Sequence, residues 1–203
     1  MEILTVLGIM SVLAVFAMSS TSALRSTALT SSGNQMADVF AMARQNSISK
    51  SDYTAVVILS QGTSAYSAYC LLELVPQDDG TFGSWTQLTP WHHLAQGTVF
   101  EPSTGSSNPA NDTFISTSVA LPSTFPALPT TFPFQGQQVN LSTSAVFQYF
   151  QPDGTLNNQP PAGLVLRMVE GNVNSGGALT YQGSSYYDLI FVSNTGIVKI
   201  RRP

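Results

Sequence analysis

The side chains best suited to catalysis or metal binding form two adjacent pairs. His92 and His93 are neighbours. Because adjacent residues of a strand point to opposite faces of a sheet, their imidazoles do not readily ligate one ion. Asp78 and Asp79 precede a glycine, a pattern that predicts a turn, where Asp is common. Neither pair has the arrangement of an acid–base or metal centre.

Sequence signatures of enzymes are absent elsewhere in the chain. No serine lies in a Gly-x-Ser-x-Gly elbow, and no glycine-rich phosphate loop opens a helix after a strand. Cys70 is the single cysteine, so no intrachain disulfide can form, and its apolar neighbours predict a small buried side chain in a strand. We therefore expect no enzymatic activity, no cofactor and no metal.

Charge is scarce and unevenly distributed. Charged residues make up 9% of the sequence and the net charge is −4, which argues against a general nucleic-acid binder. Three of the seven Lys and Arg residues lie at the end of the chain, at Lys199, Arg201 and Arg202. These cations either protect an edge strand or contact DNA. We favour edge protection, because three cations give little affinity for phosphate at ordinary salt, and we expect nucleic acid to be an unlikely partner.

A lone carboxylate opens the most apolar stretch of the chain. Glu2 is followed by residues 3–18, which are apolar on every side of a helix and need lipid or an apolar protein surround. At about 1.5 Å per residue this run covers about 24 Å, which is short of the roughly 30 Å of a hydrocarbon core. The carboxylate needs a cation, because burying it unpaired costs several kcal/mol.

The helix is expected to continue as an amphipathic one. Leu29, Met36 and Phe40 recur at helical spacing, and no proline occurs before Pro76. Gly33 is the one weak point, at a cost of about 1 kcal/mol relative to Ala. The sequence thus predicts a helix over 1–50, with an apolar membrane or filament-core segment at 2–18 and an amphipathic part at 19–50.

Residues 51–203 predict a β-rich head. Short alternating or β-branched segments separated by turn residues indicate strands. These segments are 53–59, 65–75, 85–88, 97–100, 145–150, 164–169, 186–192 and 197–201. Residues 101–138 are rich in Pro, Ser and Thr and predict an extended surface excursion with one strand at 113–121. One helix followed by strands predicts an α+β fold with the helix on antiparallel sheet.

Three interpretations of the N-terminal segment compete. A secretory signal peptide requires a basic residue before the apolar run, and none precedes Arg25. A plain membrane anchor leaves Glu2 unexplained. The third interpretation comes from a resemblance, because residues 2–14 resemble the N-terminal methylation segment of type IV pilins and type II secretion pseudopilins. The resemblance extends to strand–turn–strand sequences of the GspH/FimT-like class, including its verrucomicrobial cassette-type relatives. The similar segments of this chain are 94–99, 146–154 and 195–200.

The resemblance implies a pilin-like fold and a structural subunit of a filament. Such a prepilin lies in the bacterial inner membrane as a single-pass protein before assembly. It then packs with copies of itself and other pilin-like subunits in a helical filament at the cell surface. By the same resemblance, Glu2 pairs with the methylated terminal amine of a neighbouring subunit. The implied assembly residues are Glu2, Ile3, Leu4, Leu7, Leu13 and Phe16.

The sequence differs from the family pattern upstream of Glu2. The family's glycine and short apolar stretch are replaced by Met1 alone, so we expect this chain to start late relative to a longer precursor. Two other functions stay open. One is a minor pilin that binds DNA through the basic C-terminal strand, and the other is a membrane-anchored β-domain binding protein.

Overall fold

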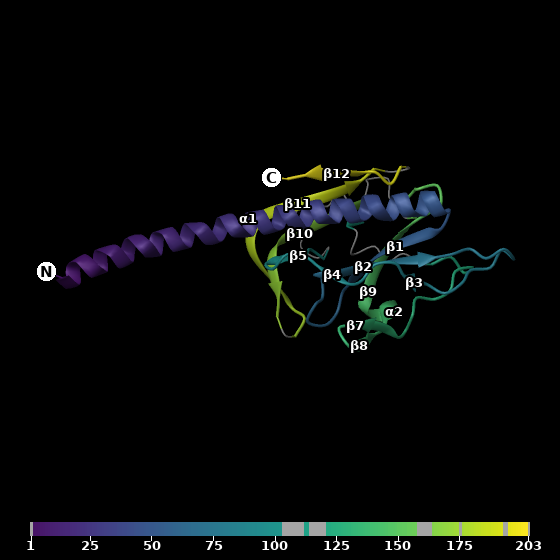
Figure 1. Ribbon diagram of the computed structural model, residues 1–203, viewed down its shortest axis with the longest axis horizontal. Coiled ribbons are helices and arrows are strands. Elements are labelled where there is room, and N and C mark those ends of the chain that lie inside the picture. Colours follow the sequence, from purple (N-terminus) through teal and green to yellow (C-terminus); the bar gives the residue numbers. More distant parts are fainter. Residues whose placement is uncertain are drawn as a thin grey trace.

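A computed structural model describes residues 2–102, 112–113, 121–157, 164–174, 176–192 and 195–202. Helix α1 (Glu2–Lys50) runs out of a β-rich head, and the C-terminus lies on the same side of the head as the projecting helix (Figure 1). The remaining elements follow in chain order: β1 (Tyr53–Leu59), β2 (Ala68–Leu74), β3 (Thr86–Gln87), β4 (His92–His93), β5 (Thr98–Phe100), β6 (Asp112–Thr113), β7 (Phe132–Phe134), β8 (Gln137–Val139), α2 (Leu141–Ser144), β9 (Ala145–Phe150), β10 (Leu164–Val173), β11 (Leu179–Phe191) and β12 (Val198–Arg201).

Three sheets make up the head. The first has the order β3-β2-β1-β9, with β4 also paired to β2. The second has the order β12-β11-β10-β5, with β6 also paired to β10, and β7 and β8 form a small third sheet. All pairings are antiparallel except that of β6 with β10.

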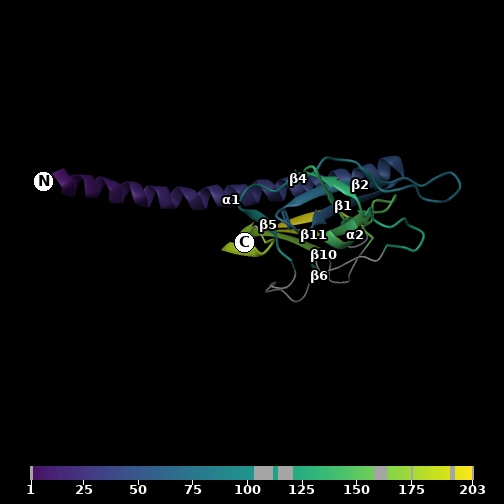
Figure 2. The ribbon, with the colours of Figure 1, turned by 90° about the horizontal axis from the view of Figure 1, so that it is seen from below.

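The predicted α+β pilin-like fold is wrong. The described part of the chain is mostly β, in three sheets, and only the half of α1 beyond Arg25 lies on them. The apolar first half extends away from the sheets in both views (Figures 1 and 2). The physical reason is that an all-apolar segment has no single face to direct towards a sheet, whereas the two large sheets supply most of their own core.

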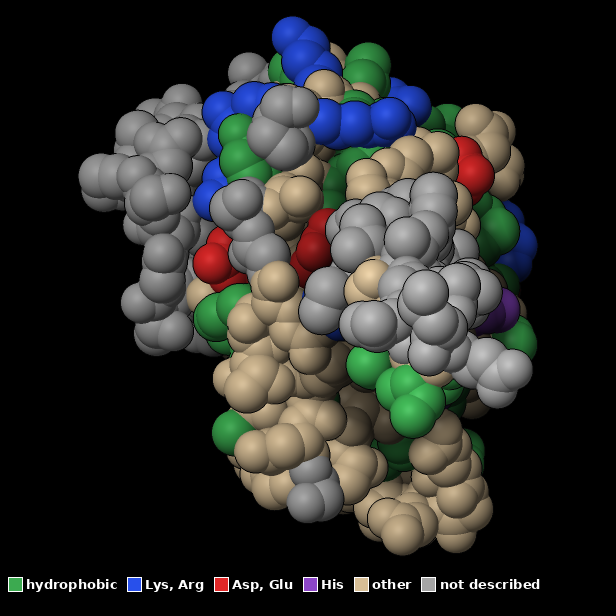
Figure 3. Space-filling model, turned by 90° about the vertical axis from the view of Figure 1, so that its left-hand side faces the viewer, with side chains coloured by type: hydrophobic (Ala, Val, Ile, Leu, Met, Phe, Trp, Pro, Cys, Tyr) green, Lys and Arg blue, Asp and Glu red, His purple; other side chains and the backbone are tan. Residues whose placement is uncertain are grey.

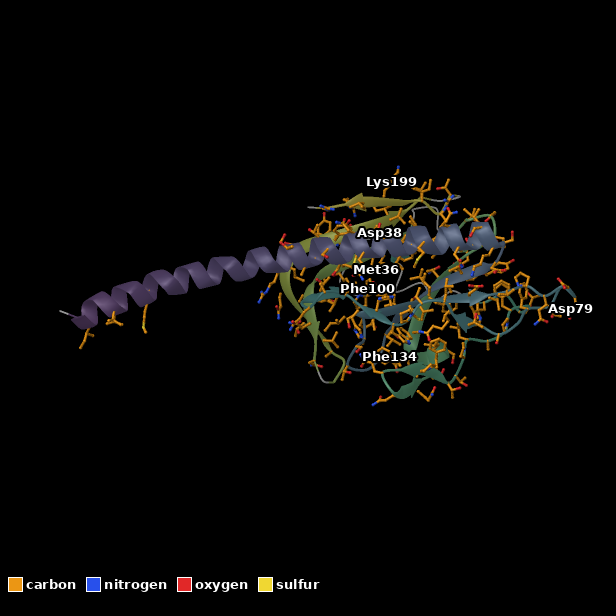
Figure 4. The ribbon with its side chains drawn as sticks, viewed as in Figure 1. Met36, Asp38, Asp79, Phe100, Phe134 and Lys199 are labelled. Carbon is orange, nitrogen blue, oxygen red and sulfur yellow. The ribbon has the colours of Figure 1, made fainter. Side chains whose placement is uncertain are left out.

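One core joins the helix to both large sheets. It contains Met36 and Phe40 of α1, Val56 of β1, and Leu166 and Leu189 of the second sheet. Phe40 meets the ring of Phe191 edge to face, with ring centroids 4.7 Å apart. Figure 4 shows Met36 beneath α1, close to Phe100 inside the head. The second half of α1 therefore anchors the projecting first half to the head.

A second core lies on the other face of the first sheet. Cys70 and Leu72 of β2 pack there with Trp85, Leu128 and Phe132. The burial predicted for Cys70 is confirmed, and this burial raises the pKa of its thiol well above the ordinary range. The first sheet is thus apolar on both faces, which is why β1 and β2 read as nearly continuous apolar runs rather than alternating ones.

Gly33 is the point where a ring of the second sheet touches the helix backbone. Tyr187 is 1% exposed, and its hydroxyl donates to Oδ1 of Asn34 at 2.8 Å. A Cβ atom on Gly33 would lie 2.5 Å from three carbons of the Tyr187 ring. The glycine that weakens the helix locally therefore allows a close approach of α1 and β11.

We expect Gly33→Ala to destabilise the protein, although alanine is the better helix former. The clash costs about 1–3 kcal/mol, against a gain of about 1 kcal/mol in helix propensity. Urea unfolding measures the net loss, which should be about 1 kcal/mol. Ser31→Ala, at an exposed position of the same helix, is the matched control and should be neutral or slightly stabilising. A Gly33→Ala protein at least as stable as the wild type would contradict the close approach.

Candidate functional site

The projecting half of α1 carries a continuous apolar stripe. Ile3, Val6, Leu7 and Met10 are 77%, 52%, 59% and 64% exposed. Their spacing of i, i+3, i+4 and i+7 places them along one side of the helix. We call these four residues the N-terminal stripe. It is the largest group of exposed apolar side chains within one element among the described residues.

The other predicted assembly residues lie on the same half of α1. Glu2, Leu4, Leu13 and Phe16 belong to the helix, and their side chains are outside the described part of the structure. The structure therefore places two of the six, Ile3 and Leu7, on the N-terminal stripe. Within the described residues, no helix combines the length and the apolarity required to cross a membrane.

The predicted basic cluster is divided among different partners. Arg201 donates from Nη2 to Oδ2 of Asp188 at 2.6 Å, and Asp188 is fully buried. Arg202 donates to Oδ1 of Asn34 at 3.1 Å, and its guanidinium carbon lies 4.8 Å from the centroid of the Tyr187 ring. Lys199 is exposed. In Figure 3, which shows the head from its N-terminal side, Lys and Arg side chains gather at the top, over α1 and β12.

A row of alternating charges crosses the second sheet. Asp188 accepts from Nε of Arg167 at 2.7 Å and faces Arg167 and Arg201 directly across β10 and β12. Glu101 extends the row, with Oε2 3.7 Å from Nε of Arg167. Burial raises the pKa of Glu101, and the neighbouring Arg167 opposes that rise. We call Glu101, Arg167, Asp188 and Arg201 the charge row.

Two members of the charge row could be recognised in the sequence as charges within apolar strands. Arg167 stands between Leu166 and Met168 in an apolar strand, and Asp188 stands between Tyr187 and Leu189. A charge in such a run requires a partner of opposite sign, because an unpaired buried charge is expensive. Which strands would bring the two together could not be read from the chain alone.

We expect the full chain to bind no duplex DNA at about 0.15 M salt, because Arg201 is neutralised by Asp188 and few cations are left free. Electrophoretic mobility shift with a short duplex measures this. A variant in which Lys199, Arg201 and Arg202 are replaced by Gln should also show no binding. Arg201→Gln alone should lower the stability of the protein, because it breaks the ion pair with Asp188. A salt-sensitive complex that disappears in the triple variant would instead support DNA binding.

The histidine and aspartate pairs each have local roles. The ring of His92 stacks on Tyr69 at 5.8 Å, whereas Nε2 of His93 lies 3.1 Å from Nε2 of Gln135. Asp79 accepts from the hydroxyl of Thr81 at 2.6 Å and from its backbone N–H at 2.9 Å, and these two hydrogen bonds lower the pKa of the Asp79 carboxyl. Among the described residues, no three His, Cys, Asp or Glu side chains come together to hold a metal ion.

Comparison with known proteins gives no relative for this chain. No family model matches it, and neither the curated proteins nor the solved structures contain a match. The resemblance of residues 2–14 to pilin methylation segments stays a prediction.

Proposed function

We propose that this chain is a structural subunit, of the pilin or pseudopilin kind, in a filament that assembles through the first half of α1. The observation that carries the proposal is the N-terminal stripe, whose four side chains are more than half exposed on a helix that projects from a folded head. Burying each such side chain is worth about 1.5–3 kcal/mol, so copies of the same helix gain much by packing together.

The head supports this role because it is complete without the stripe. Among the described side chains, the first core includes residues of α1 from Leu29 onward and the second core includes none, so the first half would be left for contacts with other chains. In a filament the first halves of many copies would form a central bundle, with the β-rich heads outside. Before assembly the same segment would lie in the bacterial inner membrane, and afterwards the filament would stand at the cell surface.

Glu2 has a specific part in the proposed assembly. It would pair with the terminal amine of a neighbouring subunit in the dry centre of the bundle, as in the family that the segment resembles. We expect Glu2→Ala to slow or block assembly, because the amine would be buried without its partner at a cost of several kcal/mol. Light scattering of the assembling protein measures the rate. Asp38→Ala, which removes an exposed acid of the same helix, is the matched control. Equal rates for both variants and the wild type would refute the pairing.

Electron microscopy of the purified full chain tests the proposed function. Helical filaments with the α1 segments at the centre and the heads outside are the expected result. Separate single-chain particles in detergent-free buffer, with α1 intact, would overturn the proposal.

A further inference from the structure

An open cleft lies beside the β7–β8 hairpin, which is on the opposite side of the head from α1 in Figure 1. Its volume is about 470 Å³, within the range of about 300–1,000 Å³ typical of small-molecule sites. One wall is β3 with the segment that follows it, and the other is the β7–β8 hairpin. The lining residues are Gln87, Leu88, Thr89, Pro90, Trp91 and, across the cleft, residues 133–136. Phe134 marks the hairpin wall in Figure 4.

The two walls are held together by Trp91. Its indole N–H donates to the carbonyl oxygen of Pro133 at 2.9 Å, and its ring meets the ring of Phe134 at 5.1 Å and 81°. A second edge-to-face contact joins Trp91 to Phe132 at 6.1 Å. The cleft therefore has rigid aromatic walls that come from segments 42 residues apart.

Besides the indole of Trp91, two amides and one hydroxyl are the polar side-chain groups of the cleft, and the Thr89 hydroxyl already accepts from the backbone N–H of Leu71 at 3.0 Å. Gln87 donates from Nε2 to the carbonyl oxygen of Thr89 at 2.8 Å, and Nε2 of Gln135 contacts Nε2 of His93 at 3.1 Å. These contacts orient both amides, and neither amide oxygen has a hydrogen-bond partner among the described residues. No lining residue carries a formal charge.

The backbone at Gln135 is held in an unusual conformation. Gln135 has a φ of 47° and Gly136 a φ of 79°, so both residues of this two-residue hairpin turn have positive φ. Such turns favour Asn, Asp or Gly at the first position. Glutamine breaks that preference, and its longer side chain reaches His93. Positive φ in a non-glycine residue costs about 1–3 kcal/mol, which is a cost often found at functional sites.

The geometry points to a binding site for a neutral saccharide. Uncharged walls give no partner for a phosphate or carboxylate, which proteins bind through Arg, Lys or backbone N–H groups. Aromatic side chains offer apolar surface for the C–H faces of sugar rings, and the two oriented amide oxygens can accept hydrogen bonds from sugar hydroxyls. An open cleft also admits part of a longer chain. The site is independent of filament assembly, because it lies on the head and uses no residue of α1.

NMR titration of the isotope-labelled full chain with cellotetraose tests the site. The protein is kept in a zwitterionic detergent, whose head group contains no sugar. Cellotetraose is neutral and has flat C–H faces. The indole N–H signal of Trp91 should shift, whereas that of Trp85 should not, because Trp85 is 4% exposed and donates to Pro126. Tetragalacturonate, an anionic tetrasaccharide, should bind more weakly.

Two variants separate the site from a general surface effect. Gln135→Ala removes one amide and should weaken cellotetraose binding about fivefold, the effect of one net hydrogen bond. Gln138→Ala changes an exposed glutamine of the same hairpin that does not line the cleft, and it should leave binding unchanged. The proposal is overturned if cellotetraose leaves the Trp91 signal in place, if tetragalacturonate binds more tightly, or if both variants bind as the wild type does.

Discussion

A single charge in the N-terminal stripe, introduced by Leu7→Asp, is expected to abolish self-association of the full chain while the head stays folded. Leu7 is 59% exposed, so the change costs the isolated chain little. In an assembly the carboxylate would be buried among apolar side chains of other copies, at a cost of about 4 kcal/mol without a cation. At 1.4 kcal/mol per tenfold, the concentration needed for assembly rises about a thousandfold.

Sedimentation and electron microscopy measure the loss of association, and circular dichroism reports the folded head. Met42→Asp is the matched control, because Met42 is an exposed apolar residue of the same helix, 46% exposed, outside the stripe. Its effect on assembly should be much smaller. If the Leu7→Asp protein sediments as the wild type does, the N-terminal stripe is not part of the assembly surface.

The largest effect on stability is expected from Asp188→Ala. Asp188 is fully buried and forms ion pairs with two arginines at 2.7 Å and 2.6 Å. Removing it leaves Arg167, which is 12% exposed, with the more distant Glu101 as its one ion-pair partner among the described residues. Losing one partner of a buried ion pair costs about 3–5 kcal/mol, so this variant should be strongly destabilised in urea or heat.

A second variant tests whether the cost comes from the unpaired charge. Replacing Arg167 and Asp188 together by leucine removes the buried charge along with its partner, and such replacements are often neutral. Because Glu101 then loses its arginine partner, the double variant should recover part, and not all, of the lost stability. Asp78→Ala, at an exposed turn, is the control and should change stability little. An Asp188→Ala protein as stable as that control would show that the charge row contributes nothing.

Strands were predictable where the local pattern was strong. Strands β1 and β9 begin and end where β-branched and aromatic residues predicted them, at 53–59 and 145–150. Strands β7 and β8 were missed because their segment is rich in proline, and Pro133 lies within β7. The strand predicted at 113–121 falls mostly outside the described residues. The α+β class was wrong because the apolar half of the helix does not lie on the sheets, and the described part of the chain is mostly β.

The cleft could not be predicted because its walls meet only in three dimensions. Nothing local in the sequence links the proline-rich segment that contains Phe134 to Trp91, which lies 42 residues before Pro133. The N-terminal stripe was predictable because all its members lie within two helical turns. Local periodicity is thus enough to predict a site on one helix, but it does not predict a site between two segments that are distant in the sequence.

The charge row also defines the alignment of the strands. Shifting β11 by one residue against β10 would turn Asp188 towards the apolar core shared with α1. A shift of two residues would keep the face but move Asp188 to a diagonal position about 7–8 Å from Arg167. Both shifts would break ion pairs that form in the native register. The second sheet can therefore accept many changes of apolar side chains and still fold with one register. The few charges of the charge row exclude the other registers.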